Sequence, residues 1–404
     1  MSIQIKFLQH VDSLSRELVN LTQELVQRKS ENPPGDERAV SELVASEFHE
    51  LGLHVEQIEA QPNRINTIGI LRGAGDGHSL LFNGHYDTVP IGDINNWSVE
   101  PYSGTPSNGW LLGRGTADEK GAIAAVLTTV HALRDCGIQL SGDLQIHAVA
   151  DEETGSRYGT QHLIQKGYVN ADMAVVMEGS TLNQQIHVRT AIRGLHWVEV
   201  ITKGKAAHSS RPRAGASAVL AMARILLALD QHNFKHTPHA LLPSPTIAAG
   251  TMISGGIKEN IIPDSCRAIC DIRTIPGMTE AQILDEVRKI IWDTMKTYPD
   301  ISIELNTRHW WPSSEISEDE EVVTLAKKAT ETVVGYQLKP IGTAGSNDAS
   351  YLNTLANIPT IAFGPGDQVL SRTHGANERV EIQNLINFTK IYGLMAMNAC
   401  GVVS

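Results

Sequence analysis

The segment DLQIHAVADEETGS, residues 143–156, is an apolar run that ends in three consecutive carboxylates, Asp151, Glu152 and Glu153. Three carboxylates directly after a strand of buried type are costly unless cations or solvent compensate their charge. A solvated acidic loop is the simpler alternative. The segment predicts a covered strand whose carboxyl end carries either that loop or a polar site.

Similar short apolar runs alternate with helical patterns over the first half of the chain. The runs are INTIGIL (65–71), SLLFNGHYD (79–87) and DMAVVMEG (172–179), and helices are expected over 120–134 and 159–166. This alternation indicates an α/β domain with a mostly parallel, covered central sheet. Towards the N-terminus we expect one helix through Leu8 to Leu25, an NPPG break at Asn32–Gly35 and a second helix that stops at Gly52.

Past residue 192 the order of predicted elements changes. The expected strands and helices follow one another as strand 195–202, helix 216–230, strand 246–252, strand 268–273, helix 279–298 and strand 301–305. This βαββαβ order is that of a ferredoxin-like unit. SEDE at 317–320 predicts a capping box, and the α/β pattern resumes through IPTIAFG (358–364) to a last helix over 383–398. We therefore predict a discontinuous domain, residues 1–189 and 308–404, interrupted by an inserted domain, residues 190–307.

Length and composition agree with this organisation. A chain of 404 residues exceeds what one hydrophobic core usually spans. With 33 Lys+Arg and 45 Asp+Glu the net charge is −12, which argues against general binding of nucleic acid or anionic membranes. The four cysteines lack disulfide or zinc-finger spacing, the first residues lack a signal-peptide pattern, and no apolar run is long enough for a membrane helix. We expect a cytoplasmic protein with reduced thiols.

Histidine and carboxylate side chains recur where strands of the first domain should end. SLLFNGHYDTVP delivers His85 and, two residues later on the same side, Asp87, which can orient the imidazole. GRGTADEKG places Asp118 between a glycine-rich turn and a helix start, and AVVMEG ends in Glu178. Read alone, the His85 pair is compatible with chance and Asp118 with a helix N-cap.

The loop LSRTHGANERV adds His374, which by itself would be an ordinary exposed histidine. Together the candidates form two ligand sets that share Asp118: His85, Asp118 and Glu178 for one metal, and Asp118, Glu153 and His374 for a second. Neighbouring Glu152 and Glu153 diverge, so one can bind metal while the other acts as general base. Nitrogen and oxygen ligands without cysteine suit zinc first, then cobalt or manganese.

These motifs resemble those of the co-catalytic zinc family of aminoacylase, acetylornithine deacetylase, succinyl-diaminopimelate desuccinylase and glutamate carboxypeptidase. The resemblance covers nearly the whole chain and rests on GHYDTVP, GRGTADEKG, DEETGS, the EG at Glu178 and the late THG. It implies two zincs on the ligands above, Asp87 orienting His85, and Glu152 as general base. Glu119 replaces the family's more usual Met, Asn or Asp, at a position that is not a ligand.

The inserted domain resembles the lid and dimerisation domain of that family. GKAAHSSRP places His208 where the family polarises the scissile carbonyl, often in the neighbouring subunit, and GGIKENIIPDSCRAICDIR places Asn260 and Arg273 where it holds a substrate carboxylate. Arginine suits a two-pronged carboxylate clamp. Read alone, the three would be a surface histidine, a turn asparagine and a strand-edge arginine. GTAGSNDASYL departs from the family's Gly-Thr-Ser-Asp loop, which leaves the roles of Ser346 and Asn347 open.

The resemblance implies a metal-dependent hydrolase that cleaves the amide bond of a small N-acyl amino acid by a metal-bridging water activated by Glu152. The substrate would be a small molecule carrying a carboxylate, and the lid would close on it through Arg273. A homodimer through the lid is expected, with Leu220, Ile225 and Leu226 as its exposed helix face. The alternatives are an exopeptidase (dipeptidase or carboxypeptidase), a hydrolase of carbamoyl or other non-peptide amines, and a non-catalytic binding protein on the same scaffold.

Overall fold

The structure is a computed structural model that describes residues 2–403, and its chain divides into two compact units. The first comprises Met1–Thr190, Ile316–Ile341 and Asn347–Ser404; the second comprises Ala191–Glu315 and Gly342–Ser346. Our prediction placed the second crossing at residues 307/308. The unit continues to Glu315 because its last strand runs from Ser302 to Trp311, well beyond the expected end.

A central sheet organises the first unit. Its strands follow the order β1-β2-β6-β3-β7-β16-β9, with bounds β1 His54–Gln61, β2 Arg64–Leu71, β3 Leu80–His85, β6 Leu144–Val149, β7 Met173–Leu182, β9 Val188–Ile192 and β16 Thr360–Asp367. The pairs β6/β3, β3/β7 and β7/β16 are parallel, whereas β1/β2, β2/β6 and β16/β9 are antiparallel. Every residue of β3, β6 and β16 is buried, as expected for a covered parallel sheet. The predicted fold class is confirmed.

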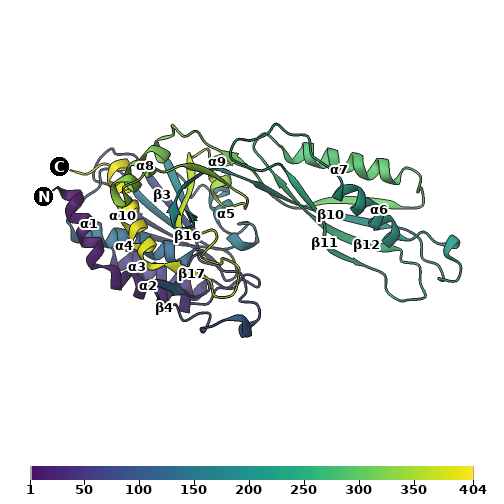
Figure 1. Cartoon of the computed structure of the whole chain (residues 1–404), viewed down its shortest axis with the longest axis horizontal. Coiled ribbons are helices and arrows are strands. Elements are labelled where there is room, and N and C mark those ends of the chain that lie inside the picture. Colours follow the sequence, from purple (N-terminus) through teal and green to yellow (C-terminus); the bar gives the residue numbers. More distant parts are fainter. Residues whose placement is uncertain (1, 404) are drawn as a thin grey trace. The chain divides into compact units, whose positions relative to one another are not determined.

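Helices cover both faces of this sheet, and Figure 1 shows the C-terminal helix beside elements from the start of the chain. The helices of the first unit are α1 Ile3–Ser13, α2 Ser15–Gln27, α3 Arg38–Glu50, α4 Lys120–Asp135, α5 Thr160–Gln165, α8 Glu321–Val334, α9 Ala349–Thr354 and α10 Ile382–Ala399. Residues of α1 to α4, α8 and α10 share one large apolar core with Leu144, Ile146 and Ala148 of β6. Val149 packs instead with Leu163 of α5 in a separate cluster, as the alternation of side chains along a strand requires.

A small antiparallel sheet joins two loops that are far apart in sequence. Its order is β17-β5-β4, with bounds β17 Arg379–Glu381, β5 Trp110–Leu112 and β4 Thr105–Ser107. Arg379 pairs with Leu112, so the loop that carries His374 is anchored to the segment that leads into Asp118. Further short elements of the chain are β8 Gln185–Ile186, β14 Ser314–Glu315, β15 Pro340–Thr343 and the 3-10 turns Ile94–Asn96, Glu152–Thr154 and Pro212–Ala214.

The second unit is a four-stranded antiparallel sheet with two helices. Its elements appear along the chain as β10 Gly194–Lys203, α6 Ala218–Asp230, β11 Thr246–Gly255, β12 Ser265–Thr274, α7 Glu280–Met295 and β13 Ser302–Trp311. The strand order is β11-β12-β10-β13. The element order is the predicted βαββαβ, with both helices packed into one core against the sheet.

Two local predictions were wrong. The opening helix breaks at Leu14, where the hydroxyls of Ser13 and Ser15 donate to backbone carbonyls and compete with the helix. The capping box expected at 317–320 does not form, because Ser317 accepts the N–H of Asp319 in a turn before α8. A capping box does form at the start of α7, between Thr279 and Gln282.

The exposed face of α6 also differs from the prediction. Ile225 is fully buried in the core of the second unit, and Leu226 packs against that core. Leu220 and Leu227 are the exposed large residues of this helix. The shift follows from the phase of the helix, since positions seven apart share one face and Ile225 lies on another.

Candidate metal centre and active site

Asp118 lies between two histidines and turns one carboxylate oxygen towards each. Its Oδ1 is 2.9 Å from Nε2 of His85, and its Oδ2 is 3.1 Å from Nε2 of His374. Nε2 of His374 is also 3.3 Å from Oε2 of Glu153. This arrangement brings together four residues that the sequence distributes over 290 positions, and it is the arrangement expected of a carboxylate that bridges two cations.

His85 is the centre of the first cluster and is buried at the end of β3. Its Nε2 lies 3.9 Å from Oε1 of Glu178 and 4.0 Å from Oε2 of Glu152. Its Nδ1 is 3.0 Å from the backbone carbonyl of Asp87 and 3.5 Å from the Asp87 carboxylate. Both the carbonyl and the carboxylate of Asp87 thus face Nδ1, with the carbonyl nearer, and the predicted role of the carboxylate in orienting the ring remains a prediction.

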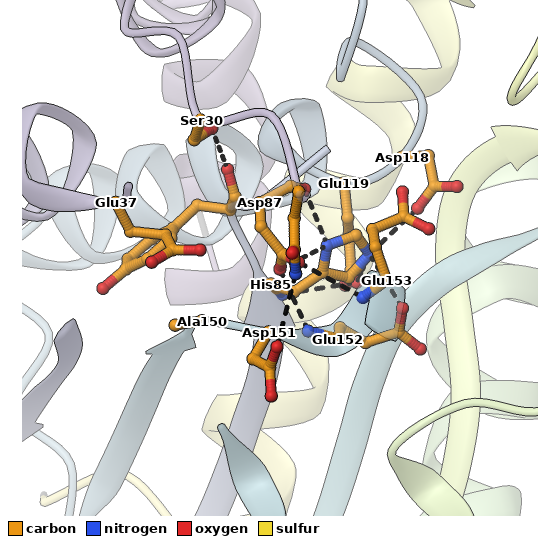
Figure 2. A network of polar contacts seen from close by, with 12 residues as sticks. Ser30, Glu37, His85, Asp87, Asp118, Glu119, Ala150, Asp151, Glu152 and Glu153 are labelled. Atoms are coloured by element: carbon orange, nitrogen blue, oxygen red, sulfur yellow. Dashed lines mark hydrogen bonds and ion pairs between the residues drawn. The ribbon is translucent and has the colours of Figure 1, made fainter. Parts of the chain in front are cut away.

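The Asp87 carboxylate also holds the turn that carries Glu152 and Glu153, as Figure 2 shows. Its Oδ1 accepts the backbone N–H of Glu152 at 3.1 Å, and its Oδ2 accepts that of Glu153 at 3.2 Å. A third bond comes from the side-chain amide of Asn32 at 2.8 Å. Although burial opposes ionisation, the contacts with His85 and Asn32 lower the pKa of Asp87, which keeps the acceptor ionised.

Glu178 lies within β7, whereas the sequence predicted it at a strand end. The parallel register between β7 and β16 shifts beside it, and a Cβ at Gly364 of β16 would lie 1.7 Å from the Met177 carbonyl oxygen. Only glycine permits this approach. The buried guanidinium of Arg189 faces this part of the site and interacts electrostatically with Glu178 and Asp118.

A buried ion pair fixes the loop of Asp118. Nη1 of Arg114 donates to Glu378 at 2.5 Å, and Oε1 of Glu378 accepts the backbone N–H groups of Gly115, Ala117 and Asp118 at 3.0 to 3.2 Å. Sequence reasoning missed Glu378. The available signal was its position four residues after His374 in the same loop.

Glu119 was also underestimated. Its carboxylate is fully buried, with Oε2 3.4 Å from Nε2 of His85 and Oε1 without a hydrogen-bond partner among the described residues. Asp348, in the loop whose role the sequence left open, is buried as well and accepts hydrogen bonds from the hydroxyls of Ser156 and Thr160. A carboxylate in an otherwise apolar or glycine-rich stretch was the signal for both.

The electrostatics show a site with more negative charge than its side chains neutralise. Burial, with the nearby Asp118 carboxylate, raises the pKa of Glu178 to about 7. Burial also raises the pKa of Glu152 well above its ordinary value, with Glu178 and Asp348 acting in the same direction and His85 opposing. Hydrogen bonds to Asp118 and Glu153 raise the pKa of His374 to about 11. Such mutual repulsion is what bound cations relieve.

The donor atoms fit divalent metals. Two groups have one donor atom from each member within 4.8 Å of the others: His85 with Asp118 and Glu153, and His85 with Glu152 and Glu178. Imidazole and carboxylate donors are those used by zinc, cobalt and manganese. The ligand sets predicted from the sequence therefore lie in one cluster, and the assignment of single residues to single metals remains a prediction.

His208 and Asn260 lie in the second unit, on neighbouring loops. The Ser209 N–H donates to the Asn260 carbonyl at 3.0 Å, and the backbones of His208 and Ile261 pair in an isolated antiparallel β-bridge. The Ser210 N–H donates to Nδ1 of His208 at 3.2 Å. The neutral ring then carries its proton on Nε2, which is the donor that a carbonyl oxygen would need.

Arg273 does not lie with them. It is near the far end of β12, opposite Leu195 of β10, whereas Asn260 precedes the other end of β12 at Ser265. Eight residues of strand at roughly 3.3 Å each separate Ser265 from Arg273 by about 26 Å. Within one chain Asn260 and Arg273 therefore lie towards opposite ends of β12, and their role in holding a substrate carboxylate remains a prediction.

The guanidinium of Arg273 has a partner that the sequence reasoning did not assign. Its Nε and Nη2 donate to the two oxygens of Asp271 at 2.7 and 3.0 Å, and Trp197 donates to the same carboxylate at 3.0 Å. Arg193 donates to the Arg273 carbonyl at 3.3 Å. These contacts hold the Arg273 guanidinium in place through Nε and Nη2, and its free edge is the side that carries Nη1.

No helix within residues 2–403 combines the length and the apolar character that a membrane crossing requires. A sequence profile of peptidase family M20/M25/M40 matches residues 81–398. The chain is 29% identical to an N-formyl-4-amino-5-aminomethyl-2-methylpyrimidine deformylase of Bacillus subtilis (strain 168), over 94% of both chains. It is 30% identical to an acetylornithine deacetylase of Vibrio atlanticus (strain LGP32), over 85% of this chain and 86% of the other.

Solved structures share the fold at lower identity. A dipeptidase from Saccharomyces cerevisiae superimposes with a TM-score of 0.82 at 18% identity, over 99% of both chains. A dinuclear metal-binding M20 peptidase of Bacillus subtilis does so with a TM-score of 0.71 at 15% identity, over 97% of this chain and all of the other. The match of the profile to most of the chain, with the two-histidine, carboxylate-rich centre on its sheet, identifies the protein as a member of peptidase family M20/M25/M40.

Proposed function

We propose that this protein is a two-metal amidohydrolase that removes a small acyl group from an amine. The observation that carries the proposal is the Asp118 carboxylate between His85 and His374, with Glu152 beside them on the turn held by Asp87. Two relatives at 29 to 30% identity, the deformylase and the acetylornithine deacetylase, are named for the removal of formyl and acetyl groups from amines. The dipeptidase likeness supports the fold alone.

Two divalent cations are proposed to bind at this centre, one held by His85, Asp118 and Glu178 and the other by Asp118, Glu153 and His374. When bound, they would supply Lewis-acid polarisation of the acyl oxygen and a water of lowered pKa. Zinc suits this donor set best, with cobalt and manganese as substitutes. The crowding of carboxylates around His85 supports the assignment, because the cluster lacks enough cationic side chains to balance it.

Glu152 is the proposed general base. Its carboxylate would take a proton from the attacking water and deliver it to the nitrogen of the leaving amine, so the same group serves both halves of the reaction. Nε2–H of His208 would donate to the carbonyl oxygen as negative charge develops on it.

The geometry of the second unit favours a homodimer in which His208 and Asn260 serve the partner subunit's site. About 26 Å of β12, approximately eight residues of strand, lies between Arg273 and the end of the strand that follows Asn260. One chain therefore separates the groups that a small substrate would have to contact together. Exposed apolar side chains on α6 and the edge strand β11, Leu220, Leu227, Met252 and Ile253, offer a surface for such a contact.

The substrate is proposed to carry a carboxylate bound by the free edge of Arg273. The ion pair of Arg273 with Asp271 favours a second candidate as well, because it already neutralises part of the arginine charge. That candidate is a substrate without a carboxylate, an acylated amine whose product is an aminopyrimidine, consistent with the name of the Bacillus relative. An exopeptidase activity on dipeptides remains a third outcome. We also propose a cytoplasmic location, which the four free and buried cysteines support.

A substrate panel on metal-reconstituted protein tests these proposals. Protein loaded with zinc, cobalt or manganese would be assayed with N-formyl, N-acetyl and N-succinyl amino acids, dipeptides and an N-formyl aminomethylpyrimidine, with metal content measured in parallel. We expect metal-dependent release of the acyl group and slower cleavage of dipeptides. Protein that binds two metal ions and hydrolyses none of the panel would refute the amidohydrolase proposal, and faster cleavage of dipeptides would replace it with a peptidase.

A further inference from the structure

One arginine lies buried between two carboxylates beside the proposed catalytic turn. Arg64, at the start of β2, is 4% exposed; its Nη1 is 2.6 Å from Oε1 of Glu37, and its Nη2 contacts Oδ1 of Asp151. Asp151 directly precedes Glu152 and has a positive φ of 67°. None of the roles assigned above to the metal ligands, the base or the substrate contacts uses Arg64.

Asp151 holds the turn that follows it through hydrogen bonds to its carboxylate and to its backbone carbonyl. Its Oδ2 accepts the backbone N–H of Tyr158 at 2.9 Å, and its Oδ1 accepts the hydroxyl of Thr154 at 2.5 Å. Its backbone carbonyl accepts the N–H of Ser156 at 2.7 Å. Two residues of this loop, Thr154 and Tyr158, therefore hydrogen-bond to this one carboxylate, and Arg64 is the cation that pairs with it.

Asn32 connects this carboxylate to the one on the other side of the turn. Its side-chain amide donates to Asp87 at 2.8 Å, to Thr154 at 3.1 Å and to Asp151 at 3.3 Å. Asp87 in turn accepts the backbone N–H groups of Glu152 and Glu153. Figure 2 shows both Asp87 and Asp151 close to the turn that carries Glu152 and Glu153.

The NPPG motif explains how the arginine fits. A Cβ at Gly35 would lie 1.3 Å from Nη1 of Arg64, and Gly35 has a positive φ of 85°. Another residue at this position would collide with the guanidinium and would also be strained. The motif thus supplies both the polar end of the network, Asn32, and the space in which Arg64 lies.

We propose that Arg64, seated against Gly35 and paired with Asp151, is a positioning residue that fixes the backbone of Glu152 and Glu153 for catalysis. The inference rests on the proposed function of Glu152 as base and Glu153 as metal ligand. Without the guanidinium, Asp151 would be a buried carboxylate next to Asp87 and Glu152, with no compensating cation. The turn would then rearrange to expose or separate these charges, and the carboxylates of Glu152 and Glu153 would move with it.

The test compares Arg64→Ala, Arg64→Lys and Gly35→Ala with a matched control, Arg72→Ala. Arg72 follows the same strand but forms an exposed ion pair with Asp143. We expect Arg64→Ala and Gly35→Ala to lower kcat by roughly 100-fold with little change in KM, because small displacements of a catalytic group cost about that much. Arg64→Lys keeps the charge but not the two-pronged reach, so its kcat should fall in between. Addition of guanidinium chloride at low concentration should restore part of the activity of Arg64→Ala and leave Arg72→Ala unchanged.

A second measurement does not depend on turnover. Calorimetric titration of metal-free protein with zinc should show that Arg64→Ala weakens one of two binding steps by roughly 10-fold or more, the effect expected when a group that orients a ligand is removed. Arg72→Ala should titrate like the unaltered protein. If Arg64→Ala does not fold, Arg64→Lys and Gly35→Ala carry both readouts.

The two proposals fail in different ways. If the unaltered protein is active and the folded Arg64 and Gly35 variants match Arg72→Ala in kcat and in zinc affinity, the positioning role is wrong and the proposed function stands. If the unaltered protein hydrolyses no substrate, the proposed function fails, and the zinc titration alone then decides whether Arg64 positions Glu153.

Discussion

The carboxylate of Asp87 accepts the backbone N–H of Glu152 at 3.1 Å, so a residue at the end of β3 fixes the turn that follows β6. The two strands are parallel neighbours, with His85 paired to Val149. The relationship ties the orientation of the proposed base to the same loop that supplies a proposed metal ligand. Predictions about the site follow from this coupling.

Replacement of the base should separate chemistry from metal binding. We expect Glu152→Gln to lower kcat by on the order of 1,000-fold, since general acid–base groups contribute roughly 100- to 10,000-fold. Metal content should stay at the level of the unaltered protein, because the backbone N–H of residue 152 still donates its hydrogen bond to Asp87. Single-turnover kinetics with metal analysis would check this, and near-full turnover in the metal-loaded variant would refute the assignment of Glu152.

Removal of the shared carboxylate should affect both metals, whereas removal of an unshared ligand should affect one. Asp118→Asn is expected to bind neither metal tightly, because each of its oxygens faces a different histidine. His374→Ala and Glu178→Gln should each retain about one equivalent of zinc, as measured by mass spectrometry of the dialysed protein. Full occupancy in Asp118→Asn would show that it is not the bridge.

A mixture of two inactive variants should recover activity if His208 acts across a dimer. Glu152→Gln and His208→Ala would each be inactive alone. A mixed dimer has one site with an intact base and an intact partner histidine, so random reassortment should restore about a quarter of the activity. The assay is turnover after co-refolding of the two variants. If no activity returns although mixed dimers form, His208 does not serve the partner subunit.

Loss of Arg273 should weaken binding of carboxylate-bearing substrates. We expect Arg273→Ala to raise KM about 10- to 100-fold, the effect of losing roughly 1.5 to 3 kcal/mol from hydrogen bonds to a charged group. Arg267→Ala is a matched control, since it lies on the same strand and pairs with Glu199. Steady-state kinetics with an acid substrate and its uncharged methyl ester would decide. An equal effect on both substrates would favour a substrate without a carboxylate.

His147 predicts a loss of stability in mild acid. Its ring is fully buried on β6, both nitrogens lack partners among the described residues, and burial lowers the pKa of His147 to about 3, compared with 6.5 when exposed. Between these values the unfolded chain binds a proton that the folded chain does not, so stability falls as pH decreases below 6.5. At pH 5 the cost is about 2 kcal/mol.

Denaturant unfolding between pH 7.5 and 4.5 measures this effect. His147→Leu should flatten the pH dependence by about the amount given, because the titrating ring is gone, whereas His54→Leu, at an exposed histidine on β1, should leave it unchanged. An identical slope in His147→Leu and the unaltered protein would mean that other groups account for the loss of stability.

Much of the fold could be predicted because local patterns are sufficient for it. The apolar runs at 79–85 and 144–149 became β3 and β6, and the βαββαβ order of the second unit follows from periodicity alone. The helix break at Leu14 and the false capping box at Ser317 were missed, because serine side chains choose between competing backbone partners only once the turn is formed. The proposed metal ligands could be picked out because strands that are parallel neighbours bring their carboxyl ends together.

By itself, the sequence determined which carboxylates and histidines follow the strands, and thus the chemistry of the centre. The tertiary structure decided what holds them in place: Asp87 on the backbone of Glu152, Glu378 on the loop of Asp118, and Arg64 on Asp151. It also separated Arg273 from Asn260 along β12. These partners lie tens to hundreds of residues apart, and each buried charge takes the partner that folding places within reach. The local periodicity of the sequence therefore does not predict which partner a buried charge will have.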